Sequence, residues 1–314
     1  MPKYRHNLPQ LDSRKYYITD GGLETNLIFK YGINLPEFAA FTLLNDPVGE
    51  SLIKDYFKHY VDLALRYGVG LQLESATWRA SRSWGEKLGY TKDQLEQVNH
   101  KAIELLVNLR TAYETPDCPF IISGCIGPKS DGYITHGDTS ISNSKMYHLD
   151  QIRSLSKTKA DMVCACTIPE YKEATGIVLA AKEVDIPVAI GFTLEIDGRL
   201  PSGQSMREAI EFVDRETQNY VSYYMINCVH PTHIMNTLKR NESWKKRIQS
   251  IRVNASCKSH AELNEAATLD EGDIVNLGLQ YAQLSALLPH LNVVGGCCGT
   301  DHRHVESIIK NLLH

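Results

Sequence analysis

The feature of this chain that most constrains its fold is a regular alternation of short apolar runs with amphipathic segments. Eight apolar runs have the length and residue types of buried strands, and helical patterns separate them. The expected strands are residues 16–19, 69–73, 120–123, 162–166, 188–192, 223–227, 251–254 and 292–294. The expected helices are residues 52–67, 91–113, 149–159, 168–184, 206–215, 233–238, 274–288 and 302–313. Eight strand–helix units without a linker predict a (β/α)8 TIM barrel, formed by residues 1–314 as a single domain.

A doubly wound α/β sheet is the alternative arrangement of such units. That fold binds nucleotides through a Gly-x-Gly-x-x-Gly turn after its first strand, and no such turn follows the first expected strand here. The segment Gly127–Asn143 is rich in Gly, Ser, Asp and Thr, which indicates a long functional loop rather than a domain boundary. The barrel is therefore the preferred prediction.

In a TIM barrel the carboxyl-terminal ends of all strands meet at one mouth, where active sites are found. The residues that the expected strand ends place there are Asp20, Thr77, Gly124, Cys166, Thr193, Asn227, Cys228, Asn254, Cys297 and Cys298. The fold alone therefore brings cysteines from distant parts of the chain to one pocket.

Two adjacent cysteines, Cys297 and Cys298, lie between paired glycines and a Gly-Thr turn in the stretch 295–300. Flanking glycines allow the backbone to turn sharply, so both sulfur atoms can face one point. Cys228 follows another expected strand and supplies a third thiol. Three thiolates with one open coordination position indicate a catalytic zinc site. The alternative is that the three cysteines are inert residues of the core.

The composition restricts the classes of function. Net charge is −4 and no block of basic residues is present, so nucleic acid is not an expected partner. No apolar run approaches the ~18 residues of a membrane span, and the first residues lack the apolar region of a signal peptide. Eight cysteines at scattered spacings do not form a disulfide pattern and indicate a reducing compartment. We therefore predict a cytoplasmic protein with no membrane partner.

Several short motifs occur together along nearly the whole chain. They are Asp20-Gly21-Gly22, Ile126-Gly127-Pro128, Gly191-Phe192-Thr193, residues 197–203, Ile226-Asn227-Cys228 and Gly295-Gly296-Cys297-Cys298. With these motifs the chain resembles the zinc-dependent homocysteine S-methyltransferase family, which includes enzymes that use betaine or S-methylmethionine. The Gly-Gly-Cys-Cys motif is the most specific of them. The resemblance implies a (β/α)8 barrel, in agreement with the strand–helix pattern.

The resemblance also implies a cofactor, two substrates and a set of site residues. Cys228, Cys297 and Cys298 would bind Zn2+ and form the catalytic centre. Zinc would deprotonate the thiol of homocysteine, and a small onium donor would pass its methyl group to that sulfur, giving methionine. The predicted substrate-binding residues are Asp20, Gly21, Gly22, Thr77, Cys166 and Asn227.

One position departs from the family pattern. The family usually carries Glu-Thr-Ile-Pro after the fourth strand, where the Glu contacts the amino group of homocysteine, whereas this chain has Cys166-Thr167-Ile168-Pro169. Homocysteine could remain the substrate, another thiol could replace it, or Cys166 could complete a closed shell of four thiolates in a non-catalytic barrel. We expect Cys166 to face the mouth without binding the metal, because a catalytic site keeps one position open.

Other side chains allow both a functional and a structural interpretation. Asp20 could hold the substrate ammonium group or be an ordinary turn residue. Trp78, Trp84 and Tyr133 could form an aromatic cage for an onium donor, although barrel packing explains each of them as well. The histidines expected to be structural are His230 and His233 at a loop or helix start, and His302 and His304 on the protein surface.

Overall fold

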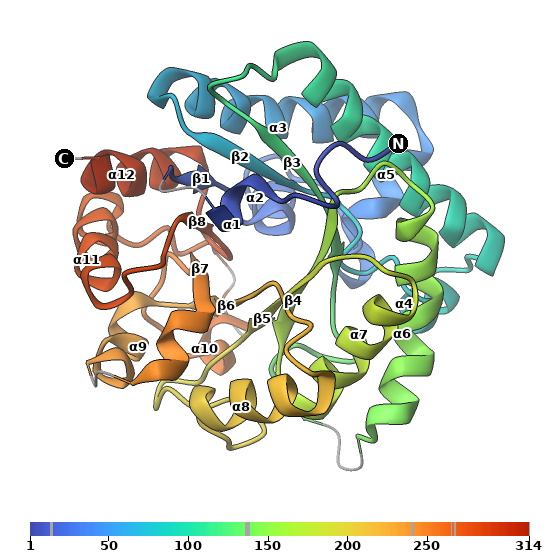
Figure 1. Ribbon diagram of the computed structural model, residues 1–314. Coiled ribbons are helices and arrows are strands. Elements are labelled where there is room, and N and C mark those ends of the chain that lie inside the picture. Colours follow the sequence, from blue (N-terminus) through green and yellow to red (C-terminus); the bar gives the residue numbers. More distant parts are fainter. Residues whose placement is uncertain (13–14, 136–138, 240–241, 265, 267, 314) are drawn as a thin grey trace.

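Eight parallel strands form a closed barrel in this computed structural model. The structure describes residues 1–314 except 13–14, 136–138, 240–241, 265, 267 and 314. The strands are hydrogen-bonded in the order β1 to β8, and β1 pairs with β8 to close the ring. Helices surround the strands on the outside (Figure 1). The predicted (β/α)8 TIM barrel is therefore confirmed.

The strands of the barrel are β1 (Tyr17–Ile18), β2 (Gly70–Glu74), β3 (Phe120–Ile126), β4 (Met162–Ile168), β5 (Val188–Phe192), β6 (Tyr223–Val229), β7 (Ile248–Val253) and β8 (Val293–Gly296). The α-helices are α1 (Pro9–Asp12), α2 (Leu23–Phe29), α3 (Pro47–Tyr67), α4 (Arg82–Lys87), α5 (Lys92–Tyr113), α6 (Ile141–Ser156), α7 (Tyr171–Glu183), α8 (Met206–Thr217), α9 (Pro231–Leu238), α10 (His260–Asn264), α11 (Ile274–Leu287) and α12 (His302–Leu313). Short 3-10 turns cover Pro36–Phe38, Ala40–Asn45 and Ser243–Arg247.

Local signals in the sequence explain why these elements form where they do. Every residue of β3, β4 and β6 is buried, as expected for parallel strands covered by helices. Capping boxes mark two helix starts, at Thr91 before α5 and at Ser205 before α8. None of the described helices combines the length and the apolar character needed to cross a bilayer.

The start of α6 differs most from the prediction. A helix was expected over residues 149–159, but α6 begins at Ile141 because the Ser140 side chain accepts a hydrogen bond from the Asn143 backbone N–H. Because the first turns of α6 are polar, the periodicity of apolar residues does not indicate where this helix begins. The predicted loop Gly127–Asn143 therefore ends at Ser140, and its residues 136–138 lie outside the described residues.

The two ends of the barrel are built differently. The N-terminal segment closes one end, where the backbone carbonyl of Gln10 accepts hydrogen bonds from the side chains of Gln249 and Asn292. Apolar side chains fill the interior above this plug, including Ile121, Met162, Cys164, Tyr223 and Met225. The carboxyl-terminal ends of the strands face the other way and form the open mouth.

Candidate active site

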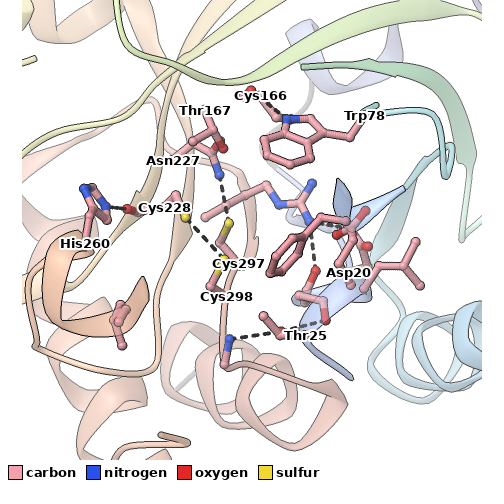
Figure 2. A pocket seen from close by; sticks show the side chains of 18 of the residues that line it. Asp20, Thr25, Trp78, Cys166, Thr167, Asn227, Cys228, His260, Cys297 and Cys298 are labelled. Atoms are coloured by element: carbon pink, nitrogen blue, oxygen red, sulfur yellow. Dashed lines mark hydrogen bonds and ion pairs between the residues drawn. The ribbon is translucent and has the colours of Figure 1, made fainter. Parts of the chain in front are cut away.

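The three cysteines predicted to bind metal lie together at the mouth of the barrel (Figure 2). Cys228 belongs to the end of β6, and Cys297 and Cys298 follow β8 directly. Their sulfur atoms all lie within 4.8 Å of one another, and the Sγ atoms of Cys228 and Cys298 are 3.5 Å apart. Within the part of the chain that the structure describes, this is the only cluster of three or more such ligands placed to hold a metal ion.

Two backbone features aim these thiols at one point. Strict alternation along β6 would turn Asn227 inward and Cys228 outward. Cys228 instead adopts a left-handed backbone conformation, with φ of 59°, at an irregularity in the β6–β7 pairing, and such bulges redirect side chains. At the last residue of β8, a Cβ atom on Gly296 would lie 2.0 Å from the hydroxyl oxygen of Thr300, so only glycine allows this close turn.

The three thiols influence each other's ionisation. Hydrogen bonds from Cys297 and Cys298 hold the pKa of Cys228 well below its usual value, and the contact with Cys228 raises the pKa values of Cys297 and Cys298. One thiolate therefore forms readily, but three negative sulfur atoms require a compensating cation. Tetrahedral zinc with bonds of about 2.3 Å places sulfur atoms about 3.8 Å apart, close to the 3.5 Å between Cys228 and Cys298. The ligand set fits zinc.

Neighbouring side chains hold the thiols in place. The Tyr133 hydroxyl lies 2.9 Å from Sγ of Cys228 and 3.9 Å from Sγ of Cys298. The Tyr133 ring stacks on His260 with centroids 4.0 Å apart, and His260 Nε2 donates to the backbone carbonyl of Cys228 at 2.8 Å. Asn227 Nδ2 contacts Sγ of Cys297 at 3.4 Å. These contacts orient the sulfur atoms and stabilise negative charge on them.

The thiols open into a cavity of about 450 Å³, a size suited to small-molecule ligands. Five of the six predicted substrate-binding residues line it: Asp20, Gly21, Gly22, Cys166 and Asn227. Thr77 is fully buried instead, and its hydroxyl donates to the backbone carbonyl of Cys125 at 2.7 Å. The structure therefore does not place Thr77 at the substrate, because its hydroxyl links the loop after β2 to β3.

Asp20 forms a buried ion pair at the cavity wall. Its Oδ1 accepts a hydrogen bond from Arg252 at 2.5 Å, and its Oδ2 accepts one from the Tyr56 hydroxyl at 3.1 Å. Burial raises the pKa of Asp20 to about 6, and the positive charge of Arg252 opposes that rise. Both oxygens of this carboxylate thus have partners within the protein.

Cys166 faces the cavity but stands apart from the three clustered cysteines (Figure 2). Its Sγ lies 3.8 Å from that of Cys164, and both belong to the inward face of β4 as predicted. Hydrogen bonds from the thiols of Cys125 and Cys164 hold the pKa of Cys166 well below its usual value. The group of mutually close sulfur atoms does not include Cys166, so the four cysteines do not form a closed shell.

The proposed aromatic cage already contains a cation that belongs to the protein. The Arg79 guanidinium carbon lies 3.9 Å from the ring centroid of Trp78 and 3.7 Å from that of Trp84. The two indoles therefore stack on Arg79, which gives both of them a structural role. Of the three aromatic candidates, Tyr133 is the one in contact with the clustered thiols.

His230 and His233 are placed as predicted, whereas His302 is only partly exposed and stacks on His59. His230 is the N-cap of α9 and His233 lies within that helix, and neither belongs to the cysteine cluster. His304 was expected on the surface but is fully buried. Its Nδ1 accepts a hydrogen bond from the Asp301 backbone N–H, and its Nε2 donates to the backbone carbonyl of Glu271. His304 faces inward because α12 packs against β8.

Several residues line the cavity without having been predicted, among them Glu74, Arg79, Thr167, Arg252 and His260. Glu74 and Arg252 occupy inward positions of β2 and β7, next to outward-facing apolar residues. A charged residue within an apolar strand could therefore have indicated from the sequence that Glu74 and Arg252 line the cavity. Arg79 and His260 lie outside the strands, where no periodic pattern indicates which side chains face the mouth.

Comparison with known proteins agrees with this description. The family model for homocysteine S-methyltransferases matches residues 17–312. Homocysteine S-methyltransferase 1 of Brassica oleracea var. italica is 24% identical over 94% of this chain and 93% of its own length. A selenocysteine Se-methyltransferase of the same plant is 23% identical over 95% of this chain and 89% of its own length. The Escherichia coli homocysteine methyltransferase MmuM is 18% identical and superposes with a TM-score of 0.76 in its oxidized form, over 96% and 97% of the two chains. Its metallated form gives a TM-score of 0.74 over 95% and 96%.

A closed eight-stranded barrel with clustered thiols at its mouth defines the class of this protein, a (β/α)8 enzyme with a cysteine-rich active site. Because the family model spans nearly the whole sequence, the chain belongs to the homocysteine S-methyltransferase family. The resemblance inferred from the short motifs is thereby confirmed.

Proposed function

We propose that this protein is a cytoplasmic, zinc-dependent S-methyltransferase that moves a methyl group from a small onium donor to the thiol of homocysteine, giving methionine. The observation that carries the proposal is the cluster of Cys228, Cys297 and Cys298 at the mouth of a barrel of this family. Relatives named homocysteine S-methyltransferase support the substrate, and the metallated form of MmuM supports a metal. The eight cysteines are all free thiols, which is consistent with a reducing compartment.

The three clustered cysteines would hold the zinc ion, which when bound would keep the substrate thiol in its deprotonated, nucleophilic form. The surrounding side chains position these ligands. Tyr133 and Asn227 contact the sulfur atoms of Cys228 and Cys297, and His260 holds the backbone of Cys228. The buried walls of the cavity limit the access of water to the reacting sulfur.

The proposed reaction is a displacement at a methyl carbon. The homocysteine thiol loses its proton to solvent, and its sulfur forms a bond to the methyl carbon of the donor. The bond between that carbon and the positively charged heteroatom of the donor breaks, and the electron pair remains on the heteroatom. The cavity contributes by holding the two reactants close together in the required orientation.

Methyl transfer from isotopically labelled donors, followed by mass spectrometry, tests this proposal. Homocysteine is offered with S-methylmethionine, S-adenosylmethionine or betaine, and labelled methionine is expected from at least one of them. The purified protein is expected to contain about one zinc ion per chain. Zinc-containing protein that forms no methionine from any donor would contradict the substrate while leaving the metal assignment intact.

A second candidate function is methylation of a different thiol or selenol by the same zinc chemistry. Two observations favour it: Cys166 stands where the family usually carries a Glu, and one relative is named a selenocysteine Se-methyltransferase. Competition between homocysteine and selenocysteine for one labelled donor separates the two candidates. A non-catalytic zinc barrel is disfavoured because Cys166 lies outside the cysteine cluster, so a coordination position stays open.

A further inference from the structure

Glu74 is a buried carboxyl group at the mouth end of β2, and it lines the cavity. It is 4% exposed. Its Oε1 accepts a hydrogen bond from Gln72 Nε2 at 2.7 Å, and Gln72 Oε1 in turn accepts one from the Tyr223 hydroxyl at 2.9 Å. Its Oε2 has no hydrogen-bond partner among the residues that the structure describes. A chain of buried hydrogen bonds thus fixes one oxygen of Glu74 and leaves the other unused.

An unpartnered carboxylate oxygen in a buried position is unfavourable, so this arrangement requires an explanation. Burial raises the pKa of Glu74 to about 8, which means that the free protein tends to keep this group protonated near neutral pH. The hydroxyl of Ser123, which lies opposite Glu74 in the pairing of β2 and β3, contributes least to lowering the pKa of Glu74 and forms no well-aligned hydrogen bond with the described residues. A ligand that donates hydrogen bonds and carries positive charge would satisfy this part of the cavity.

Two other charged groups of the wall, Asp20 and Arg252, are paired with each other. Asp20 uses its two carboxylate oxygens to bind Arg252 and Tyr56. Arg252 also donates to the backbone carbonyls of Gly21 and Gly296, which leaves Glu74 without an ion-pair partner in the described residues. Glu74, unlike Asp20, therefore has a carboxylate oxygen that is open to a cation.

We infer that Glu74 is the specificity-determining residue that receives the ammonium group of an amino-acid thiol substrate, an assignment that rests on the proposed function. The ammonium group would supply the missing hydrogen bond to Oε2 and the positive charge that favours the ionised carboxylate. Cys166 on β4 lines the same cavity and carries no carboxyl group. In this chain, β2 would thus provide the carboxylate that β4 lacks.

Binding of two thiols to the zinc-loaded protein tests the inference. The first is homocysteine, and the second is 4-mercaptobutanoate, which is homocysteine without its amino group. Glu74→Gln keeps the shape of the side chain and an acceptor for Gln72 but removes the charge. The substitution is expected to weaken homocysteine binding by roughly 10- to 100-fold and to leave 4-mercaptobutanoate binding nearly unchanged. A merely structural role of Glu74 would weaken both thiols equally, and that result would overturn the inference.

Glu24 offers a matched control within the same cavity. It lines the wall, and burial raises its pKa to about 7, but it is less buried than Glu74. Glu24→Gln is expected to leave the preference for homocysteine over 4-mercaptobutanoate intact. If Glu24→Gln removes this preference and Glu74→Gln does not, Glu24 is the ammonium site and the assignment to Glu74 is wrong.

Moving the carboxyl group between strands provides a second test. Cys166→Glu in the Glu74→Gln background returns a carboxyl group to the cavity from β4, and it is expected to restore part of the preference for homocysteine. Cys166→Glu alone adds a second acid near Glu74 and is expected to improve binding little, because like charges disfavour each other. Wild-type protein that binds neither thiol overturns the proposed function as well. Wild-type and Glu74→Gln proteins with equal preference overturn only the role of Glu74.

Discussion

Two buried carboxyl groups at opposite ends of the barrel use their oxygens in different ways. Asp161, directly before β4 at the closed end, is fully buried and accepts four hydrogen bonds from the protein. The donors are the backbone N–H groups of Lys3, Tyr4 and Ile122 and the side chain of Arg110. Glu74, at the mouth end of β2, is similarly buried but has one oxygen without a partner.

This difference indicates that the closed end of the barrel contributes mainly to stability and the mouth mainly to function. At the closed end, Asp161 ties the N-terminal segment to β3 and α5, and nothing is left for a ligand. At the mouth, one oxygen of Glu74 has no partner among the described residues and three thiols lie together, so both features leave room for a ligand or a metal ion. Substitutions at the closed end should therefore reduce stability, and those at the mouth should change metal binding and substrate choice.

The largest effect is expected at the mouth, for Cys298→Ala. With two of the three thiols left, the protein should lose its zinc and at least about 100-fold of its methyl transfer activity, because zinc activation requires the full ligand set. Circular dichroism should show that the barrel remains folded. Cys257→Ala is the control, since Cys257 is exposed and lies outside the cysteine cluster. Stoichiometric zinc in the Cys298→Ala protein would show that the ligand assignment is wrong.

The next largest effect is expected at the closed end, for Asp161→Ala. The substitution leaves the buried Arg110 guanidinium, 2.5 Å from Asp161 in the intact protein, without its partner. Breaking such a pair should lower the free energy of unfolding by about 3–5 kcal/mol. Urea denaturation measures this change, and zinc content and activity of the folded fraction should be unaffected. Asp62→Ala, which removes an exposed ion pair with Lys58, should change stability by less than about 0.5 kcal/mol.

The closed end and the mouth also differ in how well the sequence predicts them. Apolar periodicity located all eight strands, because each strand is buried on both faces and therefore reads as an apolar run. The cysteine cluster was predictable because the fold brings the ends of β6 and β8 together and the flanking glycines are distinctive. The polar first turns of α6 concealed its start.

Contacts that depend on side-chain geometry could not be predicted. Alternation along β6 gives no indication that Cys228 adopts a left-handed backbone conformation, which turns its side chain into the mouth. Nothing in the sequence shows that Arg79 fills the space between Trp78 and Trp84, or that Thr77 bonds to the backbone of β3 rather than to a ligand. Such choices depend on which neighbour lies within hydrogen-bond or stacking distance, and this is known only after the elements have packed.

An effect on pH dependence is expected for Glu74→Gln in zinc-free protein without substrate. The pKa of Glu74 is about 8 in the folded state, above its reference value of 4.5, so the folded protein binds this proton more tightly than the unfolded chain. The stabilising contribution is therefore complete below about pH 4.5 and is lost as pH rises through about 8. Relative to Glu74→Gln, the wild-type protein should lose roughly 5 kcal/mol of stability between these limits. A stability difference that does not vary with pH would contradict the buried, unpaired state of Glu74.

The smallest effect is expected for Tyr133→Phe, measured as zinc release in acid. Zinc-bound thiolates release the metal as they become protonated, so loss of zinc should accelerate as pH falls from about 7 to about 4. The Tyr133 hydroxyl lies 2.9 Å from Sγ of Cys228, and a hydrogen bond of about 1 kcal/mol to that thiolate should resist its protonation. Tyr133→Phe should therefore raise the pH of half-release by about 0.7 units, since one pKa unit corresponds to about 1.4 kcal/mol. A chelating dye follows the release.

Tyr67→Phe, which removes a hydroxyl bonded to Glu306 on the outside of the barrel, should have no effect on the release of zinc. A wild-type profile that is flat over this range would argue against thiolate ligands altogether, whereas identical profiles for wild type and Tyr133→Phe would exclude only the contribution of Tyr133.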